Sequence, residues 1–299
     1  MNFLITGGTG LIGQALISKL HQENINITVL TRDIEKAQIK LPNTVKFITR
    51  LSNVELENYD VVINLAGEPI ADKRWSKLQK DKICQSRWEI TEALVSKIQL
   101  AENPPSIFIS GSAIGIYGRQ NDTPISENFT DFNNEFTNKV CETWENIAMK
   151  ARTQSTRVAI LRTGIVLSKE YGALAKMLPP FKLGVGGKIG QGLQMMSWIH
   201  LQDMVNAIIH IINNDMLHGV INMTAEKAVS NKEFSSALAS VLNRPCLITT
   251  PNFIVKILFG EMSDILIFGQ NVSPEKLLKS QFKFKYKDIN AAMHNLLAS

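Results

Sequence analysis

Near its beginning the chain reads Thr6-Gly7-Gly8-Thr9-Gly10-Leu11-Ile12-Gly13. This glycine turn follows a short apolar run over 2–6 and precedes a pattern typical of an amphipathic helix over 11–20. A strand, a glycine-rich turn and a helix in this order form the phosphate-binding fingerprint of dinucleotide-binding proteins. Glycine lets the backbone turn tightly beside a pyrophosphate, and the helix N-terminus directs unpaired N–H groups toward it. We therefore predict cofactor contacts from Gly7, Thr9, Gly10, Leu11, Ile12 and Gly13.

Two other interpretations of the glycine turn were considered. Gly8 and Gly13 have the spacing of an NTPase phosphate-binding loop, but Gln14-Ala15 stands where that loop needs lysine followed by serine or threonine. The sequence therefore excludes an NTPase loop. A glycine-rich turn that binds nothing stays open as the alternative.

The residues after the second apolar run, 27–31, indicate which dinucleotide binds. NAD enzymes carry an acidic residue about twenty positions after the fingerprint, where it accepts a hydrogen bond from the ribose 2′-OH. This chain has Thr31-Arg32 there, and a guanidinium suits a 2′-phosphate. We expect NADP(H) rather than NAD, bound in part by Thr31 and Arg32. Two alternatives stay open, in which Arg32 is a plain surface residue or Asp33 turns toward a ribose.

Short apolar runs alternate with longer amphipathic stretches through the first two-thirds of the chain. This alternation predicts an α/β fold, a Rossmann-type doubly wound parallel sheet with helices on both faces. Helices are expected between 75 and 101 and over 139–152. The strands are expected at 2–6, 27–31, 45–49, 61–65, 107–110 and 158–162.

The pattern changes after Leu167. Pro179-Pro180 and a cluster of glycines over 184–192 predict an irregular loop. A helix over 201–213 and a strand over 220–223 follow, and Ser230 with Glu233 predicts a capping box at the start of another helix. Ser273 is expected to cap a further helix that has Pro274 in its first turn.

These elements predict two structural units. Residues 1–165, rejoined by 196–224, form an NADP-binding Rossmann domain. Residues 166–195 and 225–299 form a smaller, mostly helical C-terminal module on the substrate side.

Charge and composition narrow the class of partner. The 299 residues carry a net charge of +5, and the basic residues alternate with acidic and apolar ones, as over 80–97. Because no basic cluster forms, we expect a small-molecule substrate and no nucleic-acid partner. The five histidines include no H-E-x-x-H pair, so no metal is expected. The chain is expected to be a monomer or a homodimer.

Cysteine spacing and hydropathy predict the compartment. Cys84, Cys141 and Cys246 lie far apart with no C-x-x-C pair, which favours free thiols in a reducing environment. Gly7 comes too early for a signal-peptide core, and no apolar run is long enough to span a bilayer. We therefore expect a cytoplasmic protein without a membrane partner.

Several further blocks carry a family pattern: Asn64-Leu65-Ala66-Gly67, Ser110-Gly111-Ser112-Ala113, Leu161–Leu167, Ser197–His200 and Pro274–Leu278. Together they resemble the extended short-chain dehydrogenases/reductases, and most closely their atypical, epimerase-like subgroup. The similarity covers nearly the whole chain, including that family's small C-terminal domain, of the DUF1731 type, from about Arg244. It implies an NADP(H)-binding, epimerase/dehydratase-like oxidoreductase of small molecules, for which nucleotide sugars are the family's usual label. It also implies that Leu65, Ala66 and Gly67 contact the nicotinamide half of the cofactor.

The chain departs from this family in its catalytic motif. The wider superfamily uses Tyr-x-x-x-Lys, whose tyrosine transfers a proton while the lysine lowers its pKa and holds the ribose. Counted from Ser112, the two residues should stand near 137 and 141, where the chain has Thr137 and Cys141. Lys139 is two positions off, which on a helix turns it by ~200°.

Substitutes for this proton relay are therefore needed. Ser112 is our candidate for a hydrogen bond to a substrate oxygen, and Tyr117 for a proton donor. Their alternative roles are a serine that satisfies backbone groups and an aromatic ring that packs beside the pocket. His200 and Asp203 are expected to make capping or substrate-domain contacts. The alternative function is a non-catalytic, NADP(H)-sensing regulatory binding protein.

Overall fold

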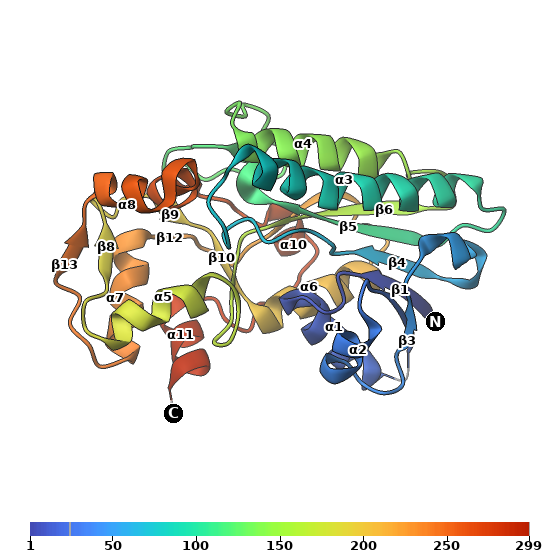
Figure 1. Ribbon diagram of the computed structural model, residues 1–299, viewed down its shortest axis with the longest axis horizontal. Coiled ribbons are helices and arrows are strands. Elements are labelled where there is room, and N and C mark those ends of the chain that lie inside the picture. Colours follow the sequence, from blue (N-terminus) through green and yellow to red (C-terminus); the bar gives the residue numbers. More distant parts are fainter. Residues whose placement is uncertain (24, 299) are drawn as a thin grey trace.

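A parallel sheet of seven strands forms the centre of the computed structural model, which describes residues 1–23 and 25–298 (Figure 1). Its order is β11-β6-β5-β4-β1-β2-β3. The chain moves outward from β1 in both directions, so the predicted doubly wound Rossmann sheet is confirmed, with its switch point between β1 and β4. The strands are β1 (Asn2–Thr6), β2 (Asn26–Leu30), β3 (Lys46–Ile48), β4 (Val61–Asn64), β5 (Ile107–Ala113), β6 (Arg157–Thr163) and β11 (Gly219–Met223).

Helices cover both faces of this sheet, which explains why its strands are apolar on both sides. In Figure 1, α3 (Lys77–Leu100) and α4 (Phe136–Met149) lie above the sheet, while α1 (Leu11–His21), α2 (Ile34–Lys40) and α6 (Leu201–Ile212) lie below it. Alternate side chains of β1 reach opposite faces. Phe3 and Ile5 are buried in the hydrophobic core with α1 and α6, whereas Leu4 is buried in the core with α3 and α4.

The C-terminal module is mostly helical, as predicted. Its helices are α5 (Gly172–Lys182), α7 (Asn231–Val241), α8 (Asn252–Phe259), α9 (Asp264–Ile267), α10 (Glu275–Lys279) and α11 (Ile289–Leu297). The predicted capping box of Ser230 and Glu233 is present at the start of α7. Pro274, rather than Ser273, occupies the N-cap position of α10. The short strands outside the central sheet are β7 (Ile165–Leu167), β8 (Gly187–Ile189), β9 (Met195–Met196), β10 (Trp198–His200), β12 (Val229–Ser230) and β13 (Ile248–Thr250).

The prediction of an irregular loop over 179–192 is wrong in two places. Pro179 and Pro180 both lie within α5, and the carbonyls that lose an N–H partner belong to Ala175, which is half-buried, and Lys176, which is exposed. Gly187 begins β8, which pairs in parallel with β13. A Cβ on Gly187 would lie 1.8 Å from the carbonyl oxygen of Ile248, so glycine here permits close strand pairing.

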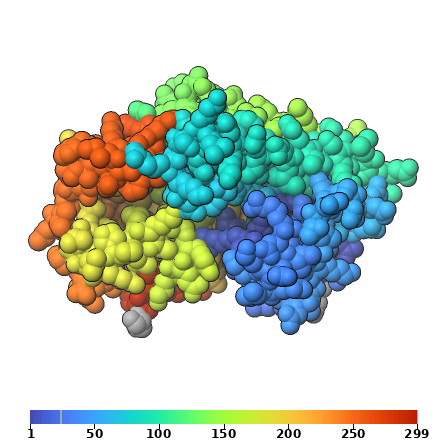
Figure 2. Space-filling view, viewed as in Figure 1, coloured from blue at the N-terminus to red at the C-terminus, as the bar shows by residue number. Residues whose placement is uncertain are grey.

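Polar contacts join the module to the Rossmann sheet across a hollow. Lys176 of α5 pairs with Asp72, and Arg119 pairs with Asp264 of α9 at 2.9 Å. Figure 2 shows the hollow between the yellow α5, the cyan segment after β4 and the dark blue N-terminal segment. In the described residues, no helix combines the length and the hydrophobicity that crossing a bilayer requires.

Candidate functional site

The glycine turn has the geometry that its sequence predicts. Gly7 has φ +68°, and a Cβ there would lie 2.5 Å from the carbonyl carbon of Leu65. A Cβ on Gly13 would lie 2.4 Å from the carbonyl oxygen of Gly7. Gly7 therefore requires glycine for its positive φ, and both Gly7 and Gly13 require it because neighbouring backbone atoms leave no room for a Cβ. The turn is drawn tightly against the loop that follows β4.

The N-terminus of α1 is open toward this turn. Its N-cap residue, Gly10, has no side chain, and the first turn contains no acidic residue. The first backbone hydrogen bond of the helix runs from the Gln14 N–H to the Gly10 carbonyl, at 2.9 Å. The three preceding N–H groups, of Leu11, Ile12 and Gly13, have no acceptor among the described residues. Unpaired N–H groups at a helix N-terminus suit an anion, so the turn fits a pyrophosphate.

A buried amide fixes the loop that the sequence assigns to the nicotinamide. The Asn64 Oδ1 accepts hydrogen bonds from the Thr6 hydroxyl at 2.6 Å and from the Ala66 N–H at 3.3 Å. Its Nδ2 donates to the Thr91 hydroxyl on α3 at 2.8 Å. The structure thus brings Leu65, Ala66 and Gly67 beside the glycine turn.

The end of β2 presents a free cation. Arg32 is exposed and has no ion-pair partner in the described part of the chain. Asp33, in contrast, is the N-cap of α2, where its carboxylate accepts from the Lys36 N–H at 3.0 Å and pairs with the Lys36 ammonium at 2.9 Å. The hydrogen bonds and charge of Lys36 lower the pKa of Asp33. The Thr31 hydroxyl accepts from the Asp33 N–H at 3.3 Å, so Asp33 is held at the helix cap.

The two candidate catalytic hydroxyls belong to one buried network. The Ser112 hydroxyl donates to Glu145 Oε1 at 2.6 Å. Arg162 holds the same carboxylate through Nε at 2.9 Å and Nη2 at 2.8 Å. Its Nη1 donates to the Tyr117 hydroxyl at 3.1 Å, which in turn donates to Asn222 Oδ1 at 2.7 Å. Both hydroxyls are therefore engaged by protein groups.

Tyr117 has no exposed surface, and burial raises its pKa, while Arg162 acts in the opposite direction. Its ring packs edge-on against Phe129 and Phe132, with ring centroids 6.0 Å and 5.9 Å away. Ser112 is 5% exposed. Glu145 and Arg162 therefore link Ser112 and Tyr117 in one hydrogen-bond network in the protein interior.

On α4 the structure places the two positions where the superfamily has tyrosine and lysine. Thr137 is half-buried against Gly115, where a Cβ would lie 3.1 Å from Thr137 Cβ. Cys141 is buried, and burial together with the Glu145 charge raises its thiol pKa to about 11. Lys139 is exposed. No side chain of α4 therefore reproduces the superfamily's proton relay.

His200 and Asp203 make the structural contacts that the sequence suggested. The His200 Nδ1 accepts from the Gln202 N–H at 3.0 Å and caps α6, and its ring stacks on Tyr286 with centroids 3.8 Å apart. Asp203 accepts from the N–H groups of Lys285 and Tyr286, each at 2.9 Å. Both residues join α6 to the last segment of the chain.

The Glu145–Arg162 pair was missed in the sequence, although two signals point to it. Arg162 ends an otherwise apolar, buried run over 158–161, where a charge requires a partner. Glu145 stands at helical spacing from Cys141 and Ala148, on the buried side of α4. Neither signal identifies the partner, because the two residues meet only in the folded chain.

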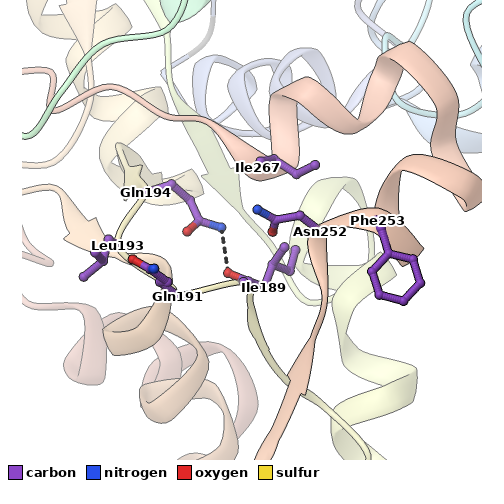
Figure 3. Close-up of a pocket in the computed structure, with 8 residues that line it drawn as sticks. Ile189, Gln191, Leu193, Gln194, Asn252, Phe253 and Ile267 are labelled. Carbon is purple, nitrogen blue, oxygen red and sulfur yellow. Dashed lines mark hydrogen bonds between the residues drawn. The ribbon is translucent and has the colours of Figure 1, made fainter.

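A pocket of about 450 Å³ lies in the C-terminal module, away from the glycine turn. Figure 3 shows the amide side chains of Gln194 and Asn252 on facing sides, with Leu193 and Phe253 at the ends. Gln194 Nε2 donates to the Ile189 carbonyl at 3.4 Å. The pocket is lined by the two chain segments, 166–195 and 225–299, that the sequence assigns to the substrate side.

The parallel sheet, the glycine turn and the open N-terminus of α1 define an NAD(P)-binding α/β protein of the extended short-chain dehydrogenase/reductase type. A model of the NAD dependent epimerase/dehydratase family matches residues 3–223, and the domain of unknown function DUF1731 matches residues 250–296. The chain belongs to this epimerase/dehydratase family, as its sequence blocks predict.

Two of the relatives are similar over their whole length, and a third over part of its length. An epimerase family protein of Staphylococcus saprophyticus is 37% identical over 297 residues, which cover 99% of both chains. The human epimerase family protein SDR39U1 (isoform 2), solved with NADPH, is 30% identical with a TM-score of 0.91, and the match covers 99% of each chain. The nucleoside-diphosphate sugar epimerase of Corynebacterium glutamicum is 28% identical with a TM-score of 0.77, over 99% of this chain and 58% of that one.

Proposed function

We propose that this protein is an NADP(H)-binding, epimerase/dehydratase-like oxidoreductase. The observation that carries the proposal is the contrast between Arg32 and Asp33 at the end of β2. Arg32 is exposed and unpaired in the described residues, whereas Asp33 is held as the N-cap of α2. A cation at this place suits a 2′-phosphate, whereas the Asp33 carboxylate, which a ribose 2′-OH would need, is engaged at the helix cap. The NADPH in the human relative supports the same preference.

The first turn of α1 would hold the pyrophosphate, and the loop over 65–67 would hold the nicotinamide half. When bound, NADP(H) supplies the hydride or accepts it. The chain's own part is to orient the cofactor, and the Asn64 amide does so by fixing the loop beside Gly7.

The substrate would lie in the hollow between this loop and the C-terminal module, outside the carboxyl ends of the strands. A nucleotide sugar is the substrate class that the Corynebacterium glutamicum relative's name supports.

Proton transfer by Ser112 and Tyr117 stays a prediction. Both hydroxyls already have partners in the Glu145–Arg162 network, so proton transfer would require one of them to exchange its partner for a substrate oxygen. The same observation favours the second candidate function, an NADP(H)-sensing binding protein without hydride chemistry.

Hydride transfer to substrate separates the two functions. The protein would be incubated with NADPH deuterated at C4 and small carbonyl compounds, and separately with NADP+ and nucleotide sugars deuterated at their hydroxyl-bearing carbons, and both the cofactor and the products analysed by mass spectrometry. The oxidoreductase proposal expects deuterium in a product or in the cofactor, and Gly7→Ala, which disrupts the turn, is the matched negative control. Binding of NADPH with no deuterium transfer to any compound would support the sensor instead.

A further inference from the structure

Arg87 is a partly buried arginine on α3 to which the sequence assigned no role. Its Nη1 donates to the Ile83 carbonyl one helical turn earlier, at 2.9 Å. Its guanidinium lies over the Trp144 ring of α4, 5.3 Å from the centroid. The side chain is therefore fixed between α3 and α4 rather than extended into solvent.

The edge of this guanidinium formed by Nε and Nη2 faces the loop over 65–67, which the family resemblance assigns to the nicotinamide half of the cofactor. A Cβ on Gly67 would lie 3.0 Å from Arg87 Cζ, 3.2 Å from Nη2 and 3.3 Å from Nε. Neither Nη2 nor Nε has a hydrogen-bond acceptor in the described part of the chain, and no carboxylate there lies within ion-pair distance. Gly67 has no side chain, so this edge of Arg87 lies next to bare backbone.

An unpaired, partly buried cation is costly for a protein to maintain. Burial lowers the pKa of Arg87, and the nearby Cys141, Cys84 and Glu68 act in the opposite direction without forming an ion pair. Glu68 itself accepts from Gln79 Nε2 at 3.4 Å. Charged groups held in this way are candidates for ligand binding.

Arg87 also lies near the position on α4 where the superfamily's lysine is missing. Trp144, on which the guanidinium packs, is three residues after Cys141 and lies on the same face of α4. Cys141 occupies the place where the superfamily has the lysine that holds the nicotinamide ribose. Arg87 of α3 therefore places a positive charge near Cys141, the position at which α4 lacks the superfamily's lysine.

We propose that Arg87 replaces this lysine and binds the hydroxyl oxygens of the nicotinamide ribose. The proposal rests on NADP(H) binding as proposed above. The Nε and Nη2 groups form one edge with two parallel donors, which suits two neighbouring acceptor oxygens. Because Thr137 stands where the superfamily has tyrosine, Arg87 would bind the cofactor without activating a tyrosine.

Two ligands and four proteins test this role. NADPH contains the nicotinamide ribose, and adenosine 2′,5′-bisphosphate lacks it but keeps the 2′-phosphate. Affinities would be measured by calorimetry for the wild type, Arg87→Gln, Arg87→Lys and Lys82→Gln. Lys82 is an exposed cation on the same helix and controls for the loss of charge.

Arg87→Gln should weaken NADPH binding about tenfold and leave adenosine 2′,5′-bisphosphate within about twofold, because only the first ligand loses charge-assisted hydrogen bonds. Arg87→Lys, which keeps the charge but not the two-donor edge, should weaken NADPH binding about threefold. It also keeps the proposal testable should Arg87→Gln fail to fold. Lys82→Gln should leave the affinity for both ligands unchanged.

Unchanged NADPH affinity in both Arg87 variants would overturn the proposal. An equal loss for both ligands would overturn it as well, since it would place Arg87 on the adenosine side or in the general fold. Failure of the wild type to bind either ligand would refute the proposed function itself, which is a different result from any of these.

Discussion

The carboxylate of Glu145 and the guanidinium of Arg162 form two parallel hydrogen bonds, at 2.9 Å and 2.8 Å, in the protein interior. Glu145 is 7% exposed and Arg162 5% exposed, so water screens neither charge. This pair joins α4 to β6 and also holds the Ser112 hydroxyl.

Breaking this pair should destabilise the fold. We expect Glu145→Gln to lower the free energy of unfolding by about 3–5 kcal/mol, because it leaves a buried guanidinium without its counter-charge. Urea denaturation followed by circular dichroism measures the change. Glu142→Gln, at an exposed position of the same helix, is the control and should change stability by less than about 0.5 kcal/mol. Similar stability of Glu145→Gln and the wild type would show that the pair contributes little.

Cys141 should make stability depend on pH in the alkaline range. Its pKa is raised from 9.0 to about 11 by burial, so the unfolded chain loses the thiol proton first as pH rises. The thiol's contribution is complete below pH 9 and is lost as pH approaches 11. Between pH 8 and pH 11 the wild type should lose roughly 2 kcal/mol more unfolding free energy than Cys141→Ala, a difference that urea titrations at both pH values measure. Equal losses would mean that the thiol ionises normally in the folded protein.

The glycines of the turn should separate folding from cofactor binding. Gly7→Ala places a side chain at φ +68° against the Leu65 carbonyl, so it should cost about 1–3 kcal/mol of stability as well as NADPH affinity. Gly10 has φ −80°, and its Cβ would meet only the Gly7 carbonyl oxygen, at 3.3 Å. Gly10→Ala should therefore melt within a few degrees of the wild type yet bind NADPH at least tenfold more weakly, because the methyl group lies where the pyrophosphate approaches. Thermal melts and calorimetry decide, and normal NADPH affinity in Gly10→Ala would contradict this use of the turn.

Tyr117→Phe tests what the buried tyrosine contributes. Removing its hydroxyl leaves Arg162 Nη1 and Asn222 Oδ1 each without one partner, so we expect about 1–3 kcal/mol of destabilisation. NADPH affinity should stay within about twofold of the wild type, because no residue of the turn or the 65–67 loop touches the hydroxyl. A variant with wild-type stability would show that the hydroxyl has no structural role and would leave proton transfer as its main one.

Local patterns in the sequence were sufficient to predict the sheet, the glycine turn and most helices. Alternate burial of Phe3, Leu4 and Ile5 shows why, since a strand covered on both faces must be apolar throughout. The double proline of α5 misled the prediction because both prolines lie on the exposed side of the helix, and that placement depends on the fold. Gly187 misled it because close pairing with β13 depends on a strand sixty residues later.

The candidate site likewise contains residues that could be predicted from local sequence patterns and residues that could not. The contacts expected of Gly7 to Gly13 rest on spacing along the chain, and so does the contrast of Arg32 with Asp33. The partners of Ser112 and Tyr117 come from α4, β6 and β11, and the neighbour of Gly67 comes from α3. Spacing along a single sequence can mark one such residue as buried, but it does not identify its partner in a distant segment, which is why the contacts of Glu145, Arg162 and Arg87 were found only in the structure.

The preference of the folded protein for NADPH over NADH shows whether Arg32 binds the 2′-phosphate of the cofactor. Both dissociation constants would be measured by calorimetry at one fixed salt concentration for the wild type and Arg32→Ala. We expect the wild type to bind NADPH at least tenfold more tightly than NADH, since a charge-assisted contact to the 2′-phosphate is worth about 1.5–3 kcal/mol. Arg32→Ala should remove most of this preference by weakening NADPH alone. Equal affinities for the two dinucleotides in the wild type, or no binding of either, would contradict the account.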